Sequence, residues 1–146
     1  MENARYEDPY SGGRGNSIRY LALSPRTDEL QVVGMENLFC AGEKAGLLVG
    51  HTEAIVTGVL AGHNAVRRAL GQPLVTIPTS TAIGDAITYV REQMETEEGM
   101  AQKYTFSGAT YFKRMKEINL YTTDIPAIQQ RVESAGLTNF FAKSLA

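Results

Sequence analysis

The sequence has a single cysteine, Cys40, and no long uninterrupted run of apolar residues. One cysteine excludes an internal disulfide framework and is typical of proteins from a reducing compartment. The longest apolar stretches are broken by glycine, histidine and threonine, so none of them predicts a membrane-spanning helix. Residues 1–8 are polar and do not resemble a secretory signal. We therefore expect a cytoplasmic protein that has no membrane partner.

Charge is also scarce. Charged residues make up 21% of the 146 positions, and the formal net charge is −2. This balance argues against a chain that wraps nucleic acid through bulk charge alone. Apolar residues make up 43% of the sequence, which is enough for one globular domain with its own core and excludes a disordered chain.

A third absence concerns the spacing of glycines. Dinucleotide-binding folds hold a pyrophosphate on a Gly-x-Gly-x-x-Gly turn after their first strand, and the sequence contains no such motif. The only early glycine cluster, Gly12–Gly15, follows a segment rich in proline, tyrosine and aspartate instead of an apolar strand. We therefore interpret residues 1–16 as a loop or an ordered arm, and a complete domain of that kind is excluded.

The sequence does contain a strand–turn–helix pattern. Leu38–Ala41 is an apolar run too short for a helix, which favours a buried strand. Gly42 permits a tight turn at its end, and Glu43 then lies at the carboxyl end of the strand, where open α/β sheets place ligands. A helix is expected from Thr52, as its N-cap, to about Leu70.

This pattern suits a nucleotide-like cofactor. A carboxylate can accept hydrogen bonds from ribose-type hydroxyls, and the amides at a helix N-terminus can stabilise a partly anionic group. The candidate cofactor-binding residues are Gly42, Glu43, Gly50, His51, Thr52, Glu53 and Ala54. Two alternatives stay open, because Glu43 can be a plain turn carboxylate and Glu53 an acidic residue favoured only by the helix dipole. Two histidines and one cysteine at these spacings predict no metal site, and no catalytic residue is assigned.

The same segment resembles known flavoproteins. Asn37–Glu43 is similar to the closing motif of two-dinucleotide-binding flavoproteins, in which a strand ends in Ala-Gly followed by Asp or Glu. The longer stretch Gly34–Ala65 resembles the GidA (MnmG)/TrmFO family of FAD-dependent proteins that modify uridines in tRNA. The elements that match are Glu53-Ala54, Gly58, Ala61-Gly-His-Asn-Ala65 and Thr81-Ala-Ile-Gly84.

The resemblance implies that the chain is the C-terminal part of a longer flavoprotein, either excised or encoded separately. The expected fold is α/β: the closing portion of a Rossmann-like FAD-binding domain plus a small helical C-terminal extension. In the family, reduced FAD passes reducing equivalents to a folate-derived one-carbon unit. FAD, tRNA and a folate would thus belong to the full-length parent. This chain alone would be inactive, and it would pair with the missing N-terminal half of the FAD domain or form a homodimer.

The resemblance also implies roles for candidate residues. Glu43 would bond the ribityl or ribose hydroxyls of FAD, and His51 would lie in the turn that touches the flavin. The amides that follow Thr52 would face the pyrimidine end of the flavin and stabilise negative charge on the reduced ring. Two other classes of function remain: an FAD-dependent oxidoreductase with no RNA role, and a stand-alone interaction module.

We divide the chain into residues 1–16, a loop or arm; 17–75, the C-terminal part of the FAD-binding domain; and 76–146, a mostly helical extension. Strands are expected at 17–23 and 29–33. The long helix should turn an apolar face into the core through Ile55, Val59, Val66 and Leu70. Gly58 and Gly62 each cost a helix about 1 kcal/mol relative to alanine, so close approach to a sheet or a flavin should require them.

Further along, one helix is expected to open at Thr79 or Ser80 and another at Asp124, where Pro126 follows. The first should bury Ile83, Ile87, Val90 and Met94, and the second should turn Ile128 and Val132 inward.

Two signals have a plainer alternative that we favour. A thiol in an apolar strand usually acts as a small hydrophobic group, so Cys40 is expected in the core and not as a reactive residue. The basic and aromatic residues of the segment 109–121 could contact RNA, but an ordinary basic surface explains them better, since Glu117 and Asp124 reduce the positive charge there. The residues that could contact RNA are Tyr111, Phe112, Lys113, Arg114 and Lys116.

Overall fold

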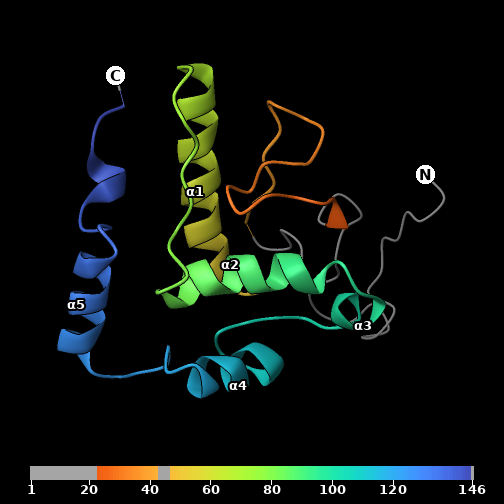
Figure 1. Cartoon of the computed structure of the whole chain (residues 1–146), viewed down its shortest axis with the longest axis vertical. Helices are drawn as coiled ribbons and strands as arrows, with labels where there is room; N and C mark the ends of the chain where they lie inside the picture. The colour runs from red at the N-terminus through yellow and green to blue at the C-terminus, as the bar shows by residue number, and fades with distance from the viewer. Residues whose placement is uncertain (1–22, 43–46, 146) are drawn as a thin grey trace.

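The computed structural model describes residues 23–42 and 47–145, and this part of the chain is mostly helical (Figure 1). Its helices are α1 His51–Ala69, α2 Ala82–Gln93, α3 Glu97–Met100, α4 Ala109–Glu117, α5 Ile125–Ser134 and the short 3-10 helix η2 Phe140–Ala142. α2 crosses the N-terminal end of α1, α4 lies on the far side of α2, and α5 stands apart toward the C-terminus (Figure 1).

The predicted strands are wrong as strands within the described residues. Gln31 and Phe39 form an isolated antiparallel bridge, and Arg26 pairs with Val32 in the same way. A β-ladder needs neighbours along its whole length to satisfy its N–H and C=O groups, and these runs find partners for single residues only. The described residues therefore show no sheet, and the predicted strand 17–23 lies almost entirely outside them.

The predicted long helix is confirmed, because α1 spans His51–Ala69. Its beginning differs from the prediction. Gly50, with a φ of 134°, is the N-cap and provides no side-chain cap, so the assignment of Thr52 as N-cap is wrong. This φ strongly favours glycine, and a Cβ at Gly50 would also lie 2.5 Å from Oε2 of Glu53.

The predicted inner face of α1 is wrong. Ile55, Val59, Val66 and Leu70 are 67%, 45%, 49% and 48% exposed. The buried residues of the helix are instead Glu53, Thr57, Leu60, Ala61 and Asn64. Three of these five are polar, and a polar side chain can be buried without penalty only where it finds hydrogen-bond partners. The position of α1 is therefore decided by its polar side chains as much as by its apolar ones.

Asn64 is the clearest case, because its side chain is fully buried. Its Nδ2 donates to the carbonyl oxygens of Glu29 at 3.0 Å and Val75 at 2.8 Å, and its Oδ1 accepts the N–H of Val75 at 2.9 Å. Thr57 acts similarly, since its hydroxyl accepts the N–H of Gly42 at 3.1 Å. These two side chains fasten α1 to the segments that precede and follow it.

The outward side of α1 carries no charge along most of its length. We define the outer face of α1 by its exposed residues Ile55, Gly58, Val59, Gly62 and Val66. Apart from the adjacent residues and the nearby backbone of α1 itself, no atom of the described residues comes within 4 Å of a Cβ placed on Gly58 or Gly62. The close approach predicted for these glycines is therefore not made by any described residue.

α2 packs across the inner face of α1 and forms the middle of the core. Its N-cap is Thr81, whose hydroxyl accepts the N–H of Gly84 at 3.2 Å, and not Thr79 or Ser80 as the sequence predicts. Ile87 and Val90 are buried as predicted. The buried apolar core as a whole comprises Leu30, Leu47, Leu48, Leu60, Ala61, Ile77, Ala86, Ile87, Val90, Tyr104, Tyr111 and Met115.

α5 lies at the periphery of the structure. It begins after Asp124 as predicted, with Pro126 in the first turn. None of its residues is buried, and Ile128, which the sequence places inward, is 41% exposed. The C-terminal segment returns to α1 instead, where Phe141 packs edge-on against His63 at a ring-centroid distance of 5.1 Å. Burial lowers the pKa of His63, which favours the neutral imidazole in this contact.

Two glycine-to-alanine substitutions should shift stability in opposite directions. Gly62 lies within α1 in open space, so alanine should raise the free energy of unfolding by about 0.5–1 kcal/mol. A Cβ on Gly84 would collide with the carbonyl oxygens of Ile77 and Pro78, so alanine should lower it there by about 2 kcal/mol. Urea unfolding followed by circular dichroism measures both changes, and shifts of the same sign would contradict this account.

Candidate cofactor site at the start of α1

The start of α1 brings together five of the seven predicted cofactor-binding residues, which are Gly50, His51, Thr52, Glu53 and Ala54. His51 and Thr52 are exposed, whereas Glu53 is buried. The first amides of an α-helix have no carbonyl partner within the helix, so the N–H groups of residues 51–53 are directed out of this end. The N–H of Ala54 already donates to the carbonyl of Gly50 at 3.0 Å. This end of α1 can therefore hold a partly anionic group through its first three amides.

The other two predicted residues lie on the turn before the helix. Gly42 has a φ of 86°, as expected for a tight turn, and its N–H donates to Thr57. That bond uses the Gly42 amide to attach the turn to α1. Glu43 lies outside the described residues, so its place in the site stays a prediction.

Glu53 has a different environment from the one that the sequence suggests. Its side chain is only 3% exposed, and Oε1 accepts the backbone N–H of Phe106 at 2.6 Å. The carboxylate thus binds a segment 53 residues further along the chain. Sequence patterns contain no signal for this pairing, because nothing local marks the amide of Phe106 as its partner.

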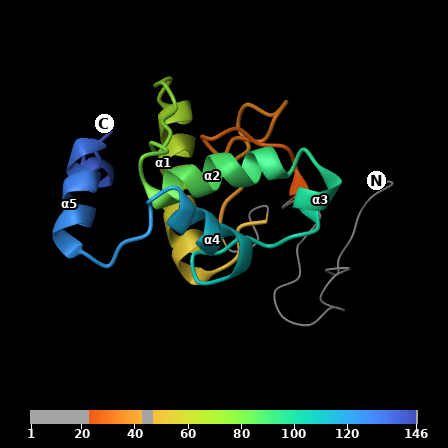
Figure 2. The ribbon, with the colours of Figure 1, turned by 60° about the horizontal axis from the view of Figure 1, so that its bottom comes forward.

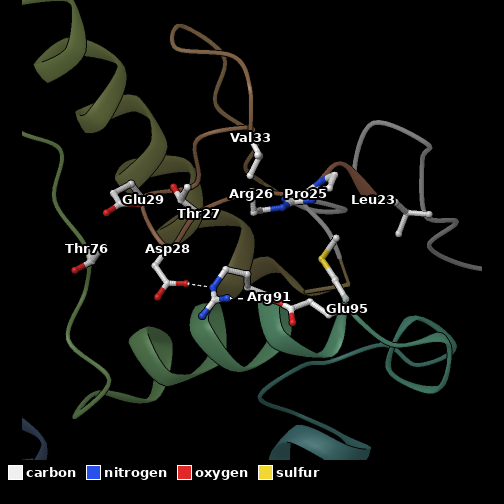
Figure 3. A pocket seen from close by; sticks show the side chains of 11 residues that line it. Leu23, Pro25, Arg26, Thr27, Asp28, Glu29, Val33, Thr76, Arg91 and Glu95 are labelled. Carbon is white, nitrogen blue, oxygen red and sulfur yellow. Dashed lines mark hydrogen bonds and ion pairs between the residues drawn. The ribbon is translucent and has the colours of Figure 1, made fainter.

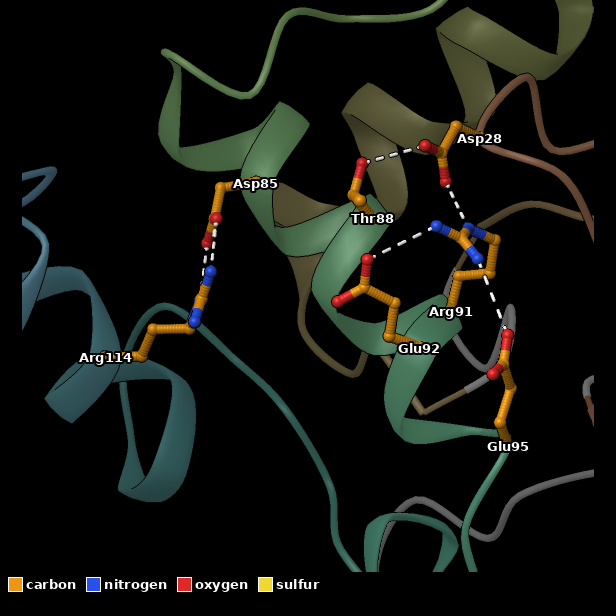
Figure 4. A network of polar contacts seen from close by, with 7 residues as sticks. All are labelled: Asp28, Asp85, Thr88, Arg91, Glu92, Glu95 and Arg114. Atoms are coloured by element: carbon orange, nitrogen blue, oxygen red, sulfur yellow. Dashed lines mark hydrogen bonds and ion pairs between the residues drawn. The ribbon is translucent and has the colours of Figure 1, made fainter.

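α2 and α4 are joined by a buried polar network that the sequence did not reveal. Asp85 is 7% exposed and accepts two hydrogen bonds from Arg114, at 2.9 and 2.7 Å (Figure 4). It also accepts the hydroxyl proton of Tyr111 at 3.0 Å. Burial first and the Asp85 carboxylate second raise the pKa of the Tyr111 phenol, and the bonds to Asp85 raise the pKa of Arg114. The sequence contained one sign of this network: Asp85 is a single acidic residue on an otherwise apolar face of α2.

This network changes the interpretation of the basic and aromatic residues in α4. Tyr111 is fully buried and Arg114 is paired with Asp85, so neither is presented to a nucleic acid. Lys113 is exposed beside Glu117 at 3.7 Å, and the ammonium of Lys116 lies 4.5 Å from the ring centre of Phe112. The favoured interpretation as an ordinary surface agrees with these contacts.

A second polar cluster connects the segment before α1 to α2. Asp28 accepts the hydroxyl proton of Thr88 at 2.9 Å and the Nε–H of Arg91 at 2.7 Å (Figure 4). The hydrogen bond from Arg91 to Asp28 is the main reason why the pKa of Arg91 is raised. A cavity of about 590 Å³ opens beside this pair (Figure 3). Its lining comprises Leu23, Pro25, Arg26, Thr27, Asp28, Glu29, Val33, Thr76, Arg91, Met94 and Glu95.

Cys40 is half-buried and lies close to the buried guanidinium of Arg26. Burial lowers the pKa of Arg26, and the neighbouring Cys40 partly offsets that effect. The expected core position of the thiol is thus met only in part. Within residues 23–42 and 47–145, no helix is long and apolar enough to cross a membrane, and no three side chains of the metal-binding types gather.

Comparisons with known proteins agree with the resemblance seen in the sequence. The family described as glucose inhibited division protein A matches residues 1–73, which is half of the chain. No solved structure matches the chain significantly.

Several curated relatives bear the name methylenetetrahydrofolate–tRNA-(uracil-5-)-methyltransferase TrmFO. The protein of Symbiobacterium thermophilum is 47% identical over 68 residues, 47% of this chain and 14% of its own length. That of Lactobacillus acidophilus is 36% identical over 92 residues, 62% of this chain and 20% of its own length. That of Dictyoglomus thermophilum is 36% identical over 69 residues, 47% of this chain and 16% of its own length. The chain thus spans a fifth or less of these relatives, and by its sequence it belongs to the GidA/TrmFO family of flavoproteins.

Proposed function

We propose that this chain supplies the closing segment of the FAD-binding domain in an enzyme that modifies uridines in tRNA with a folate as one-carbon donor. The observation that carries the proposal is the start of α1, where the N-cap is a glycine with no side chain to bond the first three amides, and where His51 and Thr52 are exposed. The family match covers this segment. The names of the relatives supply the substrate class, because they are methyltransferases of tRNA uracil that use methylenetetrahydrofolate.

The residues present fit one part of FAD. FAD would bring redox chemistry, accepting and donating electrons at its flavin ring. The amides of residues 51–53 would hold the partly anionic edge of that ring. Gly50 is required beside them for a different reason, because a Cβ there would meet the carboxylate of Glu53. The sequence has no Gly-x-Gly-x-x-Gly turn, so these residues account for the flavin end and not for the pyrophosphate.

The outer face of α1 supports a partner that belongs to the same domain. A contiguous apolar helix face is normally covered by a partner, yet Ile55 and Val59 are open to solvent here. Gly58 and Gly62 leave room for a second backbone to approach closely. The relatives are at least five times longer than the part matched by this chain, so they contain further chain that can cover such a face. We therefore assign the outer face to the remaining half of the FAD-binding domain, with residues 76–146 as a mostly helical extension.

The proposal is tested by adding FAD to the purified chain and following amide hydrogen exchange. We expect weak binding that protects residues 50–54. His51→Pro removes one amide at the first helical position, where proline is tolerated, and should weaken binding. His51→Ala is the matched control, because it removes the imidazole and keeps the amide. If FAD protects no residue at the start of α1, or if both variants bind equally well, the proposed site is wrong.

A further inference from the structure

The segment that Glu53 binds is fixed to the start of α1 by more than one contact. Leu48 and Tyr104 form a parallel bridge, in which the N–H of Tyr104 donates to Leu47 at 2.8 Å and the N–H of Val49 donates to Tyr104 at 2.9 Å. Two residues after Tyr104, the N–H of Phe106 donates to the side chain of Glu53, so the same two parts of the chain stay in contact. We call residues 104–108 the latch segment.

The latch segment is anchored on its other side as well. The side chain of Tyr104 is fully buried, and its hydroxyl donates to the carbonyl of Gly99 at 3.1 Å. Burial raises the pKa of that hydroxyl to about 12, so it stays protonated and can donate at neutral pH. Phe106 packs against Tyr111 at a ring-centroid distance of 5.6 Å. Gly108 is then the N-cap of α4, which lies below α2 in Figure 2.

Between these anchors the latch segment presents two hydroxyl groups. Ser107 is exposed and Thr105 is half-buried. Their side-chain oxygens lie 3.2 Å apart, and the N–H of Ser107 donates to Oγ1 of Thr105 at 3.3 Å. The two hydroxyls are thus held together one residue on either side of the Phe106 amide that Glu53 binds.

The helix dipole alone does not explain the position of the Glu53 carboxylate. An acidic residue in a first turn is favoured wherever its carboxylate lies near the helix end, and solvent exposure is its usual state. Here the carboxylate is buried, and its Oε1 accepts from a different segment. Burying a carboxylate is costly unless it is hydrogen-bonded, so the pairing with Phe106 accounts for its position.

We propose that Glu53 is a positioning residue for the cofactor site, and that the latch segment forms the second side of that site. Glu53 does not contact the cofactor. It fixes residues 104–108 next to the amides of α1, so that the hydroxyls of Thr105 and Ser107 face the flavin end of FAD. This inference rests on the proposed function, because it assigns further residues to the same site.

Hydrogen exchange with and without FAD tests the inference on the full chain. In the unaltered chain we expect FAD to protect both residues 50–54 and the latch segment. Glu53→Ala should speed exchange of the latch segment several-fold even without FAD, and should remove the protection that FAD gives it. Glu53→Gln keeps an acceptor oxygen for the Phe106 amide, so it should restore both.

A second variant keeps the test decisive if Glu53→Ala does not fold. Ser107→Ala changes an exposed residue, so exchange without FAD should stay unchanged while FAD affinity falls several-fold. Protection of residues 50–54 without protection of the latch segment, or full affinity in Ser107→Ala, overturns this inference and leaves the proposed function standing. No protection anywhere overturns the proposed function itself.

Discussion

Asn64→Ala should lower the free energy of unfolding by about 4 kcal/mol, the largest effect that we expect from a single substitution. The side chain makes three hydrogen bonds at 2.8–3.0 Å, all to backbone groups of Glu29 and Val75. Alanine would leave these groups buried without partners, and each such group costs about 1–3 kcal/mol. Because small domains are stable by only about 5–15 kcal/mol, much of the chain should be unfolded at moderate urea concentrations.

Urea unfolding monitored by circular dichroism measures this loss. Asn64→Asp is an informative companion, because it retains the oxygen that accepts from Val75 and loses both donated bonds. His51→Ala, at an exposed position of the same helix, should change stability by less than about 0.5 kcal/mol. A loss in Asn64→Ala no larger than that of this control would show that α1 is held by its apolar contacts alone.

Asp85→Ala should cost about 3 kcal/mol, the second largest effect. It would leave the guanidinium of Arg114 and the hydroxyl of Tyr111 without their shared acceptor. Removing one partner of a buried ion pair costs about 3–5 kcal/mol, and the 32% exposure of the Arg114 side chain places this case at the lower end. Tyr111 retains its bond to the carbonyl of Ala82 at 2.6 Å, which limits the loss further.

A double-mutant cycle separates the pair from its surroundings. Arg114→Met removes the charge and keeps the aliphatic stem, so adding it to Asp85→Ala should cost less than the sum of the two single losses. Glu92→Ala serves as a control, since Glu92 lies on the exposed side of α2. Strictly additive losses would mean that Asp85 acts through packing and not through Arg114.

The sequence predicted where the helices lie along the chain better than it predicted which side of each helix is buried. The end of α1 and the start of α5 were within one residue and the start of α1 within two, because glycine and proline mark helix boundaries locally. The inner face of α1 was wrong because hydrophobicity placed Val59 and Val66 inside, whereas Asn64 and Thr57 decide the orientation through distant partners. An asparagine in mid-helix is unfavourable by propensity, and that mismatch was the signal that a buried role existed.

Only those features of the candidate site that depend on residues adjacent in the sequence could be predicted. Gly50, His51 and Thr52 lie at the helix start that the turn predicted, although the capping residue differs. Glu53 was assigned to the site because its carboxylate could bind a cofactor, but in the structure that carboxylate accepts the N–H of Phe106. The strands failed for a related reason, since a strand such as 29–33 forms only where other segments supply partners for its whole length.

The long separation between Glu53 and Phe106 sets an order of assembly during synthesis. The two residues are 53 positions apart, and Asp28 and Arg91 are 63 positions apart. Chains emerge from the ribosome N-terminus first, and contacts that close long loops form late. α1 can therefore form as soon as it emerges. The Glu53 carboxylate in its first turn stays without the Phe106 amide until α2 and α3 have also been synthesised. The end of α1 that is translated first is the last to reach its final form.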